Sequence, residues 1–365
     1  MKKILCLVLA MLMLAGALVS CNTGSEPEET TAADTTAEDT TTVADTTTTT
    51  APEDLHVPSG EPANIKLMSF NLQSSYRSES RINNVFTLLS ENPMDVYCFQ
   101  ECDTWMDDLN ERLKADGYVI ASGTKIPGNE ADDAIYYNKN TLTHIKSGFF
   151  KLMSKGTKVG SSECKHTRYF TYAVFEHYET GKQFVVINTH LDNSSDEVRL
   201  EQAKTMFTII KNGPALADYR ELPMILCGDM NADYQSGEDA SRPGGYYHPT
   251  ESTFHYLNDG SLFKWATEFE GTEYIYENTP VFRWYPGDPY TLINNAFKTD
   301  YRNDGSAEDV AGNMDKRIID FIFLSPNGSI TPHTYEVLYR NFSTKENCWK
   351  YASDHMPIMC DMTIN

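Results

Sequence analysis

The chain has 365 residues, a formal net charge of −22 and 12% aromatic residues. This length suffices for one large domain or two ordinary ones. So acidic a chain lacks the broad basic surface of most nucleic-acid binders, although bound divalent cations would change the local sign.

The first 21 residues have the pattern of an export signal. Two lysines precede an apolar run from Ile4 to Val19, which is shorter than a typical transmembrane span. The run ends in LVSC, which resembles the lipobox of bacterial lipoproteins and so implies that Cys21 is lipidated. We therefore expect a lipoprotein signal peptide at residues 1–21 and an extracytoplasmic protein anchored by lipid at the bacterial cell surface. The alternative is an ordinary signal peptide that is cut near Cys21.

Residues 22–62 are dominated by Thr, Asp, Glu, Ala and Pro, and no basic residue occurs between Lys3 and Lys66. Such a segment cannot bury enough apolar surface to offset the entropy of ordering it. We expect a disordered stalk at residues 22–62 that joins the membrane to a catalytic domain at residues 63–365.

Six cysteines follow Cys21, and their spacing matches no zinc pattern. They are Cys98, Cys102, Cys164, Cys227, Cys348 and Cys360. Cys98, Cys227 and Cys360 lie in apolar, strand-like runs, where reduced core thiols are expected. The sequence leaves the pairing of the six open.

Hydrophobic periodicity predicts more strands than helices in the folded part. In chain order the pattern predicts a strand at 64–73, a helix that begins at 81 and stops before Pro93, a strand at 95–101, a helix at 104–117, strands at 133–142, 168–177 and 181–192, a helix at 194–212, and strands at 223–229, 317–325 and 353–364. A capping box of Ser194 and Glu197 is expected to open the third helix. Consecutive hairpin candidates favour a single α+β domain with two sheets packed as a sandwich over a doubly wound parallel sheet.

Each predicted strand ends in carboxylate, amide or imidazole side chains. These are Asn71, Gln100–Glu101, Asn188–Asp192 with His190, Asp229–Asn231, Asp320 and Asp354–His355. One such residue alone is usually a turn residue. Their repetition indicates a shared site, because strand ends in a sandwich converge on one rim. Scattered oxygen ligands suit a hard cation such as Mg²⁺, and nearby histidines suit phosphoester hydrolysis.

Six short motifs occur in an order that resembles the endonuclease/exonuclease/phosphatase superfamily, which includes deoxyribonucleases, neutral sphingomyelinases and inositol-polyphosphate 5-phosphatases. They are MSFNLQ, CFQEC, NTHLD, GDMNA, IIDFIFL and SDHMP, and the resemblance covers about residues 64–365. It implies a four-layer α/β sandwich, in which two mixed sheets pack face to face with helices outside. It also implies one or two Mg²⁺ or Mn²⁺ ions at a rim.

The resemblance also implies roles for individual residues. Asn71 and Glu101 look like the first metal-binding pair, with Gln100 shaping the strand end. Asp229 resembles the aspartate that activates the attacking water or holds a second metal, and Asn231 the asparagine that contacts the phosphate.

The remaining implied roles fall on two histidines and their partners. His190 resembles the histidine that stabilises the pentacovalent transition state. Asp354 and His355 resemble a closing pair, in which Asp354 orients the imidazole or contacts metal, and Asp320 resembles the aspartate that supports the other histidine. Arg168 lies where related secreted members carry an arginine that could bind phosphate; the alternative is an arginine that only ends a strand.

The residues of the site do not identify the substrate. Nucleic acid, lipid phosphate and sugar phosphate all stay open, and a monomer that hydrolyses a phosphodiester is expected. The aromatic segments 246–250 and 281–291, within the irregular region 234–316, could stack bases, touch a membrane or pack locally. The alternative function is a surface protein that uses the same fold for adhesion or ligand capture without turnover.

Overall fold

The computed structural model describes residues 56–123, 131–232, 252–275, 319–338 and 352–365. The predictions for residues 1–21 and Cys21, most of the stalk, both aromatic segments and Cys348 lie outside these ranges. No helix within them is both long and apolar enough to cross a membrane.

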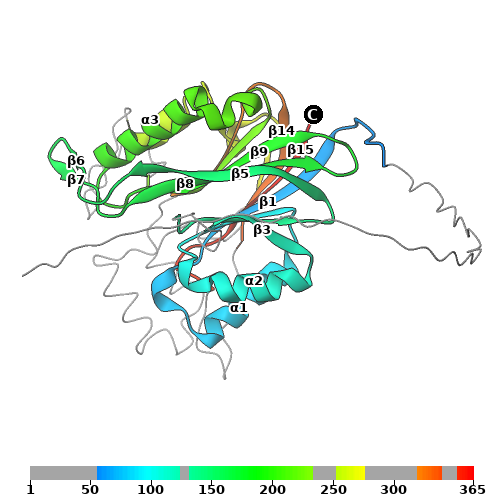
Figure 1. Cartoon of the computed structure of the whole chain (residues 1–365), viewed down its shortest axis with the longest axis horizontal. Coiled ribbons are helices and arrows are strands. Elements are labelled where there is room, and N and C mark those ends of the chain that lie inside the picture. Colours follow the sequence, from blue (N-terminus) through cyan, green and yellow to red (C-terminus); the bar gives the residue numbers. More distant parts are fainter. Residues whose placement is uncertain (1–55, 124–130, 233–251, 276–318, 339–351) are drawn as a thin grey trace, which may run out of the picture. The chain divides into compact units, whose positions relative to one another are not determined.

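Two large mixed sheets pack face to face, as expected (Figure 1). In spatial order the seven-stranded sheet contains β12 (Glu273–Ile275), β14 (Ile330–Val337), β15 (Ile358–Ile364), β1 (Ala63–Asn71), β2 (Val96–Gln100), β4 (Ala134–Asn138) and β3 (Tyr118–Ser122). The six-stranded sheet contains β11 (Lys264–Trp265), β13 (Asp320–Leu324), β10 (Met224–Asp229), β9 (Gln183–His190), β8 (Arg168–His177) and β5 (Leu142–Met153). A separate hairpin joins β6 (Lys158–Val159) to β7 (Ser162–Glu163).

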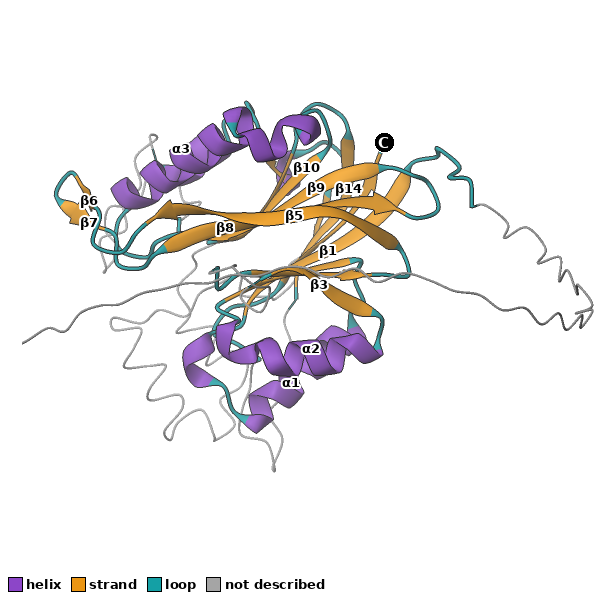
Figure 2. Cartoon of the chain, in the orientation of Figure 1, coloured by secondary structure: helices purple, strands orange, loops and turns teal. Residues whose placement is uncertain are grey.

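Helices cover both outer faces of this sandwich, so that the fold has four layers (Figure 2). Helices α1 (Glu79–Glu91) and α2 (Met106–Ala115) cover the seven-stranded sheet, while α3 (Asp196–Asn212) lies over the six-stranded one. The short α4 (Thr253–Leu257) packs against α3. Short 3₁₀ helices occur at Ser74–Tyr76, Asp103–Trp105, Pro214–Tyr219 and Ala266–Glu268.

The central strands are apolar on both faces because helices cover one face and the partner sheet covers the other. All six residues of β10 and all five of β2 are buried. β1 pairs in parallel with β2, and β9 pairs in parallel with β10, so the carboxyl ends of each pair lie at the same edge of its sheet. The remaining strand pairs near the site are antiparallel.

The start of α3 differs from the predicted capping box. Ser195, rather than Ser194, is the N-cap residue, and its hydroxyl accepts a hydrogen bond from the backbone N–H of Val198. The hydroxyl of Ser194 instead bonds the carboxylate of Asp192. The sequence places two serines side by side. Ser194 bonds the nearby carboxylate of Asp192, two residues earlier, and Ser195 is left to cap the helix.

Five cysteines lie in the described residues, and all five are free thiols in the interior. They are Cys98, Cys102, Cys164, Cys227 and Cys360. This confirms the expectation of reduced core thiols at Cys98, Cys227 and Cys360. Cys98 of β2 and Cys227 of β10 lie near each other between the two sheets, and burial raises the pKa of the Cys98 thiol well above its usual range.

Candidate active site

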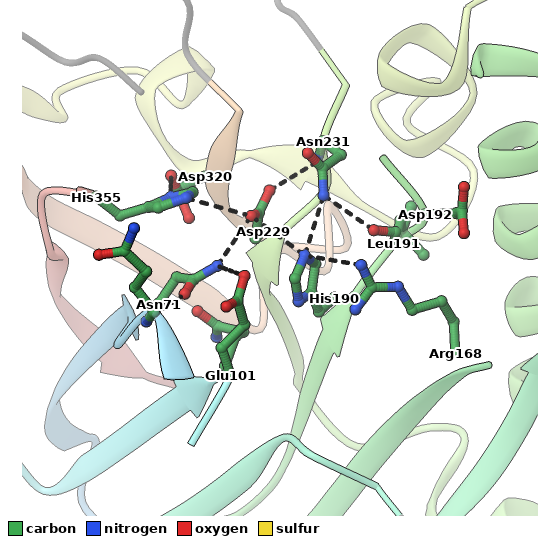
Figure 3. Close-up of polar contacts among 12 residues, drawn as sticks. Asn71, Glu101, Arg168, His190, Leu191, Asp192, Asp229, Asn231, Asp320 and His355 are labelled. Carbon is green, nitrogen blue, oxygen red and sulfur yellow. Dashed lines mark hydrogen bonds and ion pairs between the residues drawn. The ribbon is translucent and has the colours of Figure 1, made fainter. Parts of the chain in front are cut away.

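The polar strand ends that the sequence singles out meet at one rim of the sandwich (Figure 3). Asn71 ends β1, His190 ends β9 and Asp229 ends β10. Glu101 directly follows β2. Asp320 starts β13, which runs antiparallel to β10, and it therefore pairs with Asp229.

Asp229 is the centre of this cluster. Its Oδ2 accepts a hydrogen bond from Asn71 Nδ2 at 3.1 Å and lies 3.4 Å from His190 Nε2 and 3.6 Å from His355 Nε2. Its Oδ1 accepts the backbone N–H of Asn231 at 2.9 Å. One buried carboxylate therefore contacts groups from both sheets and both histidines.

Gly228 allows Asp229 to reach this position. Its φ is +136°, and a Cβ atom at this residue would lie 1.9 Å from the backbone oxygen of Thr189 on the neighbouring strand β9. No side chain can occupy that space, so only glycine lets β10 approach β9 this closely.

We call Asp320, Asp354 and His355 the acidic side of the site. His355 Nδ1 lies 2.8 Å from Asp320 Oδ2, which directs Nε2 of the same ring toward Asp229. Asp354 Oδ1 lies 4.0 Å from His355 Nε2. The expected pairing therefore requires correction: Asp320 orients the imidazole of His355, and Asp354 does not.

Electrostatics on the acidic side favour a charged imidazole. Burial by itself lowers the pKa of His355, but the carboxylates of Asp320, Asp229 and Asp354 outweigh burial and raise this pKa to about 10. Without a bound cation, these carboxylates favour an imidazolium that donates a hydrogen bond from Nδ1 to Asp320 and faces Asp229 with Nε2 at 3.6 Å.

We call Arg168, His190 and Asn231 the phosphate side. His190 Nε2 lies 3.2 Å from Arg168 Nη2 and 3.0 Å from Asn231 Nδ2. A guanidinium has no acceptor atom, so this contact requires an unprotonated Nε2 on His190. Asn231 Nδ2 also donates to the carbonyl of Leu191 at 3.0 Å, which fixes the orientation of the amide.

Two carboxylates flank the phosphate side at the start of β4. Asp132 and Asp133 precede Ala134, and Asp133 is 1% exposed. Burial raises the pKa of both carboxyl groups, whereas the charge of Arg168 opposes that rise. The sequence analysis missed this acidic pair, because a DD sequence before a strand has the pattern of an ordinary turn.

Glu101 and Asn71 face Asp229 from the seven-stranded sheet. Glu101 accepts hydrogen bonds from Asn71 Nδ2 and the backbone N–H of Ser74, both at 3.3 Å. Burial raises the pKa of Glu101, and the charge of Asp354 raises it further. A bound cation would favour the ionised carboxylate, so this environment suits a metal ligand.

Backbone strain concentrates at these strand ends. In the described part of the chain, three residues other than glycine have a positive φ: Gln73 at 55°, Glu101 at 50° and Asn231 at 47°. Each directly follows, or lies two residues after, a strand that carries a site residue. Left-handed conformations of this kind are unfavourable and cluster at functional sites.

The donors fit a hard cation. Glu101 and Asp229 supply carboxylate oxygens, which Mg²⁺ prefers as ligands. Asn71 directs its Nδ2 toward both carboxylates, and its Oδ1 accepts the backbone N–H of Gln73, so its amide would have to turn over to bind a cation. A second grouping was not expected: ligand atoms of Asp229, Asp320 and His355 all lie within 4.8 Å of one another. Because His355 Nδ1 already pairs with Asp320, a cation held by this grouping would have to take His355 through Nε2.

Arg81 and Ser353 support the site from behind, and the sequence analysis missed both. Arg81 is 1% exposed and donates to the carbonyls of Leu72 and Ala352, which ties the segment after β1 to the segment before His355. The hydroxyl of Ser353 donates to the carbonyl of Asn71 at 2.7 Å. A buried arginine in an amphipathic helix resembles an exposed one in sequence, so periodicity gives no signal for it.

Comparison with known proteins agrees with this geometry. The model of the Endonuclease/Exonuclease/phosphatase family matches residues 68–355. Nocturnin of Xenopus laevis is 22% identical over 344 residues, which cover 84% of this chain and 74% of nocturnin.

Two solved structures from Bacteroides thetaiotaomicron share the fold. An endonuclease/exonuclease/phosphatase family protein has a TM-score of 0.59 at 21% identity, covering 84% of this chain and 99% of its own. A mannosyl-6-phosphatase has a TM-score of 0.56 at 20% identity, covering 82% and 99%. With the family model matching most of its length, this chain belongs to the Endonuclease/Exonuclease/phosphatase family and thus to the phosphoester-cleaving enzymes.

Proposed function

We propose that this chain is a divalent-metal-dependent hydrolase that cleaves a phosphodiester by in-line attack of an activated water. The observation that carries the proposal is the position of Asp229. Its carboxylate lies between the metal-ligand candidates Asn71 and Glu101 on one sheet and the donors of the phosphate side on the other.

The phosphate side supplies hydrogen-bond donors for an anion. Arg168 Nη2 and Asn231 Nδ2 converge within 3.2 Å of one point, which His190 Nε2 occupies. The ring of His190 fills that point, so a phosphate oxygen, which is an acceptor of the same kind, would bind these donors after they turn from the ring toward the substrate. N–H donors directed at the phosphate would then stabilise the charge that builds up in the transition state.

Asp229 and the acidic side supply the acid–base chemistry. The carboxylate of Asp229 would orient the attacking water and accept its proton. His355, charged and held by Asp320, lies 3.6 Å from Asp229 Oδ2 and would stabilise negative charge beside it. Glu101 would hold the cation through its carboxylate, and Asn71 would join it through Oδ1 after its amide turns over. The cation would neutralise phosphate charge as a Lewis acid.

The similar proteins are named for more than one class of phosphoester, so they do not by themselves identify the substrate. The mannosyl-6-phosphatase that shares this fold is named for a phosphomonoester, whereas the family name includes nucleases. The excess of acidic over basic residues favours a small phosphoester of a lipid or sugar over long nucleic acids. Oligomerisation is not needed to complete the site, and we propose a monomer.

The test is hydrolysis by the purified full chain with Mg²⁺, with Mn²⁺ and with EDTA. Three substrates separate the classes: supercoiled plasmid, bis(p-nitrophenyl) phosphate and p-nitrophenyl phosphate. We expect metal-dependent turnover that falls by about 1,000-fold or more in Asp229→Asn, because this substitution removes the proton acceptor without changing side-chain size.

The outcomes separate the alternatives clearly. Plasmid nicking would identify a nuclease, and cleavage of the small esters alone would identify a lipid or sugar phosphoesterase. A folded chain that binds Mg²⁺ and the esters but turns over none of the three would contradict the proposal and favour a binding protein.

We also propose that lipid attached to Cys21 anchors the protein at the bacterial surface. The support is the LVSC sequence after the apolar run of residues 4–19. Cys21→Ser should move the protein from the membrane fraction to the soluble fraction and abolish incorporation of labelled palmitate. Unchanged fractionation and labelling in this variant would contradict the anchor.

A further inference from the structure

A pair of buried amides connects the two sheets directly beneath the candidate active site. Gln100 is the last residue of β2, and Asn188 lies in β9 of the opposite sheet. Gln100 Nε2 donates a hydrogen bond to Asn188 Oδ1 at 2.7 Å. Both side chains are 0% exposed, so no solvent competes for this bond.

The orientation of both amides is determined by their other partners. Asn188 Nδ2 donates to the carbonyls of Phe99 at 2.9 Å and Ala134 at 3.1 Å, both of the seven-stranded sheet. Its Oδ1 must therefore face Gln100, which must in turn present its Nε2. One side chain of the six-stranded sheet is thus bonded to two strands, β2 and β4, of the other sheet.

The bridge lies one to two residues from the reacting groups on both sheets. Gln100 directly precedes Glu101, and Asn188 precedes His190 by two residues. Asn188 pairs with Cys227 on β10 in the same register that pairs His190 with Asp229. A shift of β9 against β2 would consequently separate Glu101 from His190 and Asp229.

Stability alone does not account for a polar pair at this depth. The residues two positions before each amide, Cys98 on β2 and Val186 on β9, are apolar and buried. Moreover, Gln100 Oε1 has no hydrogen-bond partner among the described residues, and burying an unpartnered acceptor is destabilising. Buried polar groups are retained in some proteins because they specify one register, which an apolar pair does not.

We propose that Gln100 and Asn188 are positioning residues of the enzyme. Their bridge fixes the separation and register of the two sheets, so that Asn71 and Glu101 meet Asp229 and the phosphate side at the distances that turnover requires. This inference rests on the proposed function, because it assumes that these groups act together on one phosphoester.

The test uses the full chain with Gln100→Met, Asn188→Ala and the double variant. Ser325→Ala is the matched control, because the buried hydroxyl of Ser325 bonds Met224 at the opposite end of β10. For each protein we would measure kcat and KM on bis(p-nitrophenyl) phosphate, Mn²⁺ affinity by electron paramagnetic resonance, and the thermal midpoint Tm.

We expect each single substitution to lower kcat by about 10- to 100-fold with KM within about twofold, and to weaken Mn²⁺ binding by a similar factor. The double variant should have a kcat about as low as the more impaired single variant, because each substitution alone already removes the hydrogen bond between Gln100 and Asn188. Ser325→Ala should lower Tm comparably while keeping kcat and Mn²⁺ affinity.

If the bridge variants lose only Tm, and match Ser325→Ala in kcat and Mn²⁺ affinity, the positioning role is overturned. If the wild type cleaves no phosphoester but binds Mn²⁺, the proposed function fails. In that case Mn²⁺ binding tests the positioning role: it is supported if Gln100→Met and Asn188→Ala weaken Mn²⁺ binding, and overturned if they do not. A wild type that neither turns over nor binds Mn²⁺ overturns both proposals.

Discussion

The acidic side and the phosphate side each bring a histidine to the same carboxylate oxygen of Asp229, yet their surroundings are opposite. His355 is held by Asp320 and surrounded by carboxylates, which raise its pKa to about 10. Nε2 of His190 faces the guanidinium of Arg168 and must accept from it. Neighbouring charge, rather than residue type, thus makes one ring a donor and the other an acceptor.

We expect the largest effect from Gly228→Ala, because this substitution would displace the Asp229 carboxylate that both histidines contact. The new Cβ would overlap the backbone oxygen of Thr189, and neither atom belongs to a flexible side chain. We expect a loss of at least about 4 kcal/mol of unfolding free energy, or no soluble protein. Urea unfolding measures this loss.

The matched control for that prediction is Gly156→Ala. Gly156 also has a positive φ of +85°, but nothing lies within 4 Å of its Cβ position. Its cost should be only about 1–2 kcal/mol, that of the strained backbone. Equal costs at both positions would show that the close approach of β10 to β9 is unimportant.

Asp320→Asn should break the acidic side alone. It removes the charge that holds His355 Nδ1, so we expect kcat to fall about 100-fold or more, while KM changes little because the phosphate side is intact. Steady-state kinetics at saturating Mg²⁺ measures both constants. Asp354→Asn provides the comparison: Asp354 lies 4.0 Å from the ring, and its loss should instead raise the Mg²⁺ concentration needed for half-maximal activity. A fall of equal size and kind in the two variants would contradict the assignment of Asp320 as the partner of His355.

Arg168→Lys should weaken the phosphate side by a smaller amount. Lysine keeps the positive charge but lacks the planar pair of donors, so we expect KM to rise about 10-fold with a lesser effect on kcat. Kinetics on the small phosphoester that the wild type prefers would measure this rise. An unchanged KM would show that Arg168 does not bind the substrate and is only the first residue of β8.

The smallest expected effect lies outside both sides, at the N-cap of α3. Ser195→Ala removes the hydrogen bond to the Val198 N–H and should cost about 1 kcal/mol of stability, with kcat unchanged. Ser194→Ala serves as the comparison, because its hydroxyl bonds Asp192 rather than the helix. Thermal unfolding and kcat of both variants sharpen the boundary of the site.

Much of the site was predictable because its residues mark the points where apolar runs stop. Asn71, His190 and Asp229 each close a buried strand, and the two-sheet fold follows from the number and spacing of those strands. Partner choice was less predictable. Asp320 pairs with Asp229, and so reaches His355, only through the antiparallel register of β13 and β10.

Other features left no trace that periodicity could detect. The positive φ at Glu101 and Asn231 depends on where the chain must turn after a strand. A glycine at either position would have predicted it, but neither residue is a glycine. Arg81 is buried because it donates hydrogen bonds to the carbonyls of Leu72 and Ala352, which are 280 positions apart in the sequence. Local sequence carries no record of such a contact.

The reactivity of the buried thiols reports on whether the two sheets separate. Cys98 and Cys227 meet between the sheets, and burial raises the pKa of the Cys98 thiol well above its usual range, so neither should react with an alkylating reagent while the sandwich is closed. The rate at which iodoacetamide labels these two cysteines would therefore measure how often the two sheets separate far enough to expose the thiols. Peptide mass mapping would assign the label to each cysteine. Labelling faster than global unfolding would indicate local opening of the sandwich near the candidate active site, and labelling at the rate of global unfolding would indicate that the sheets separate only when the whole domain unfolds.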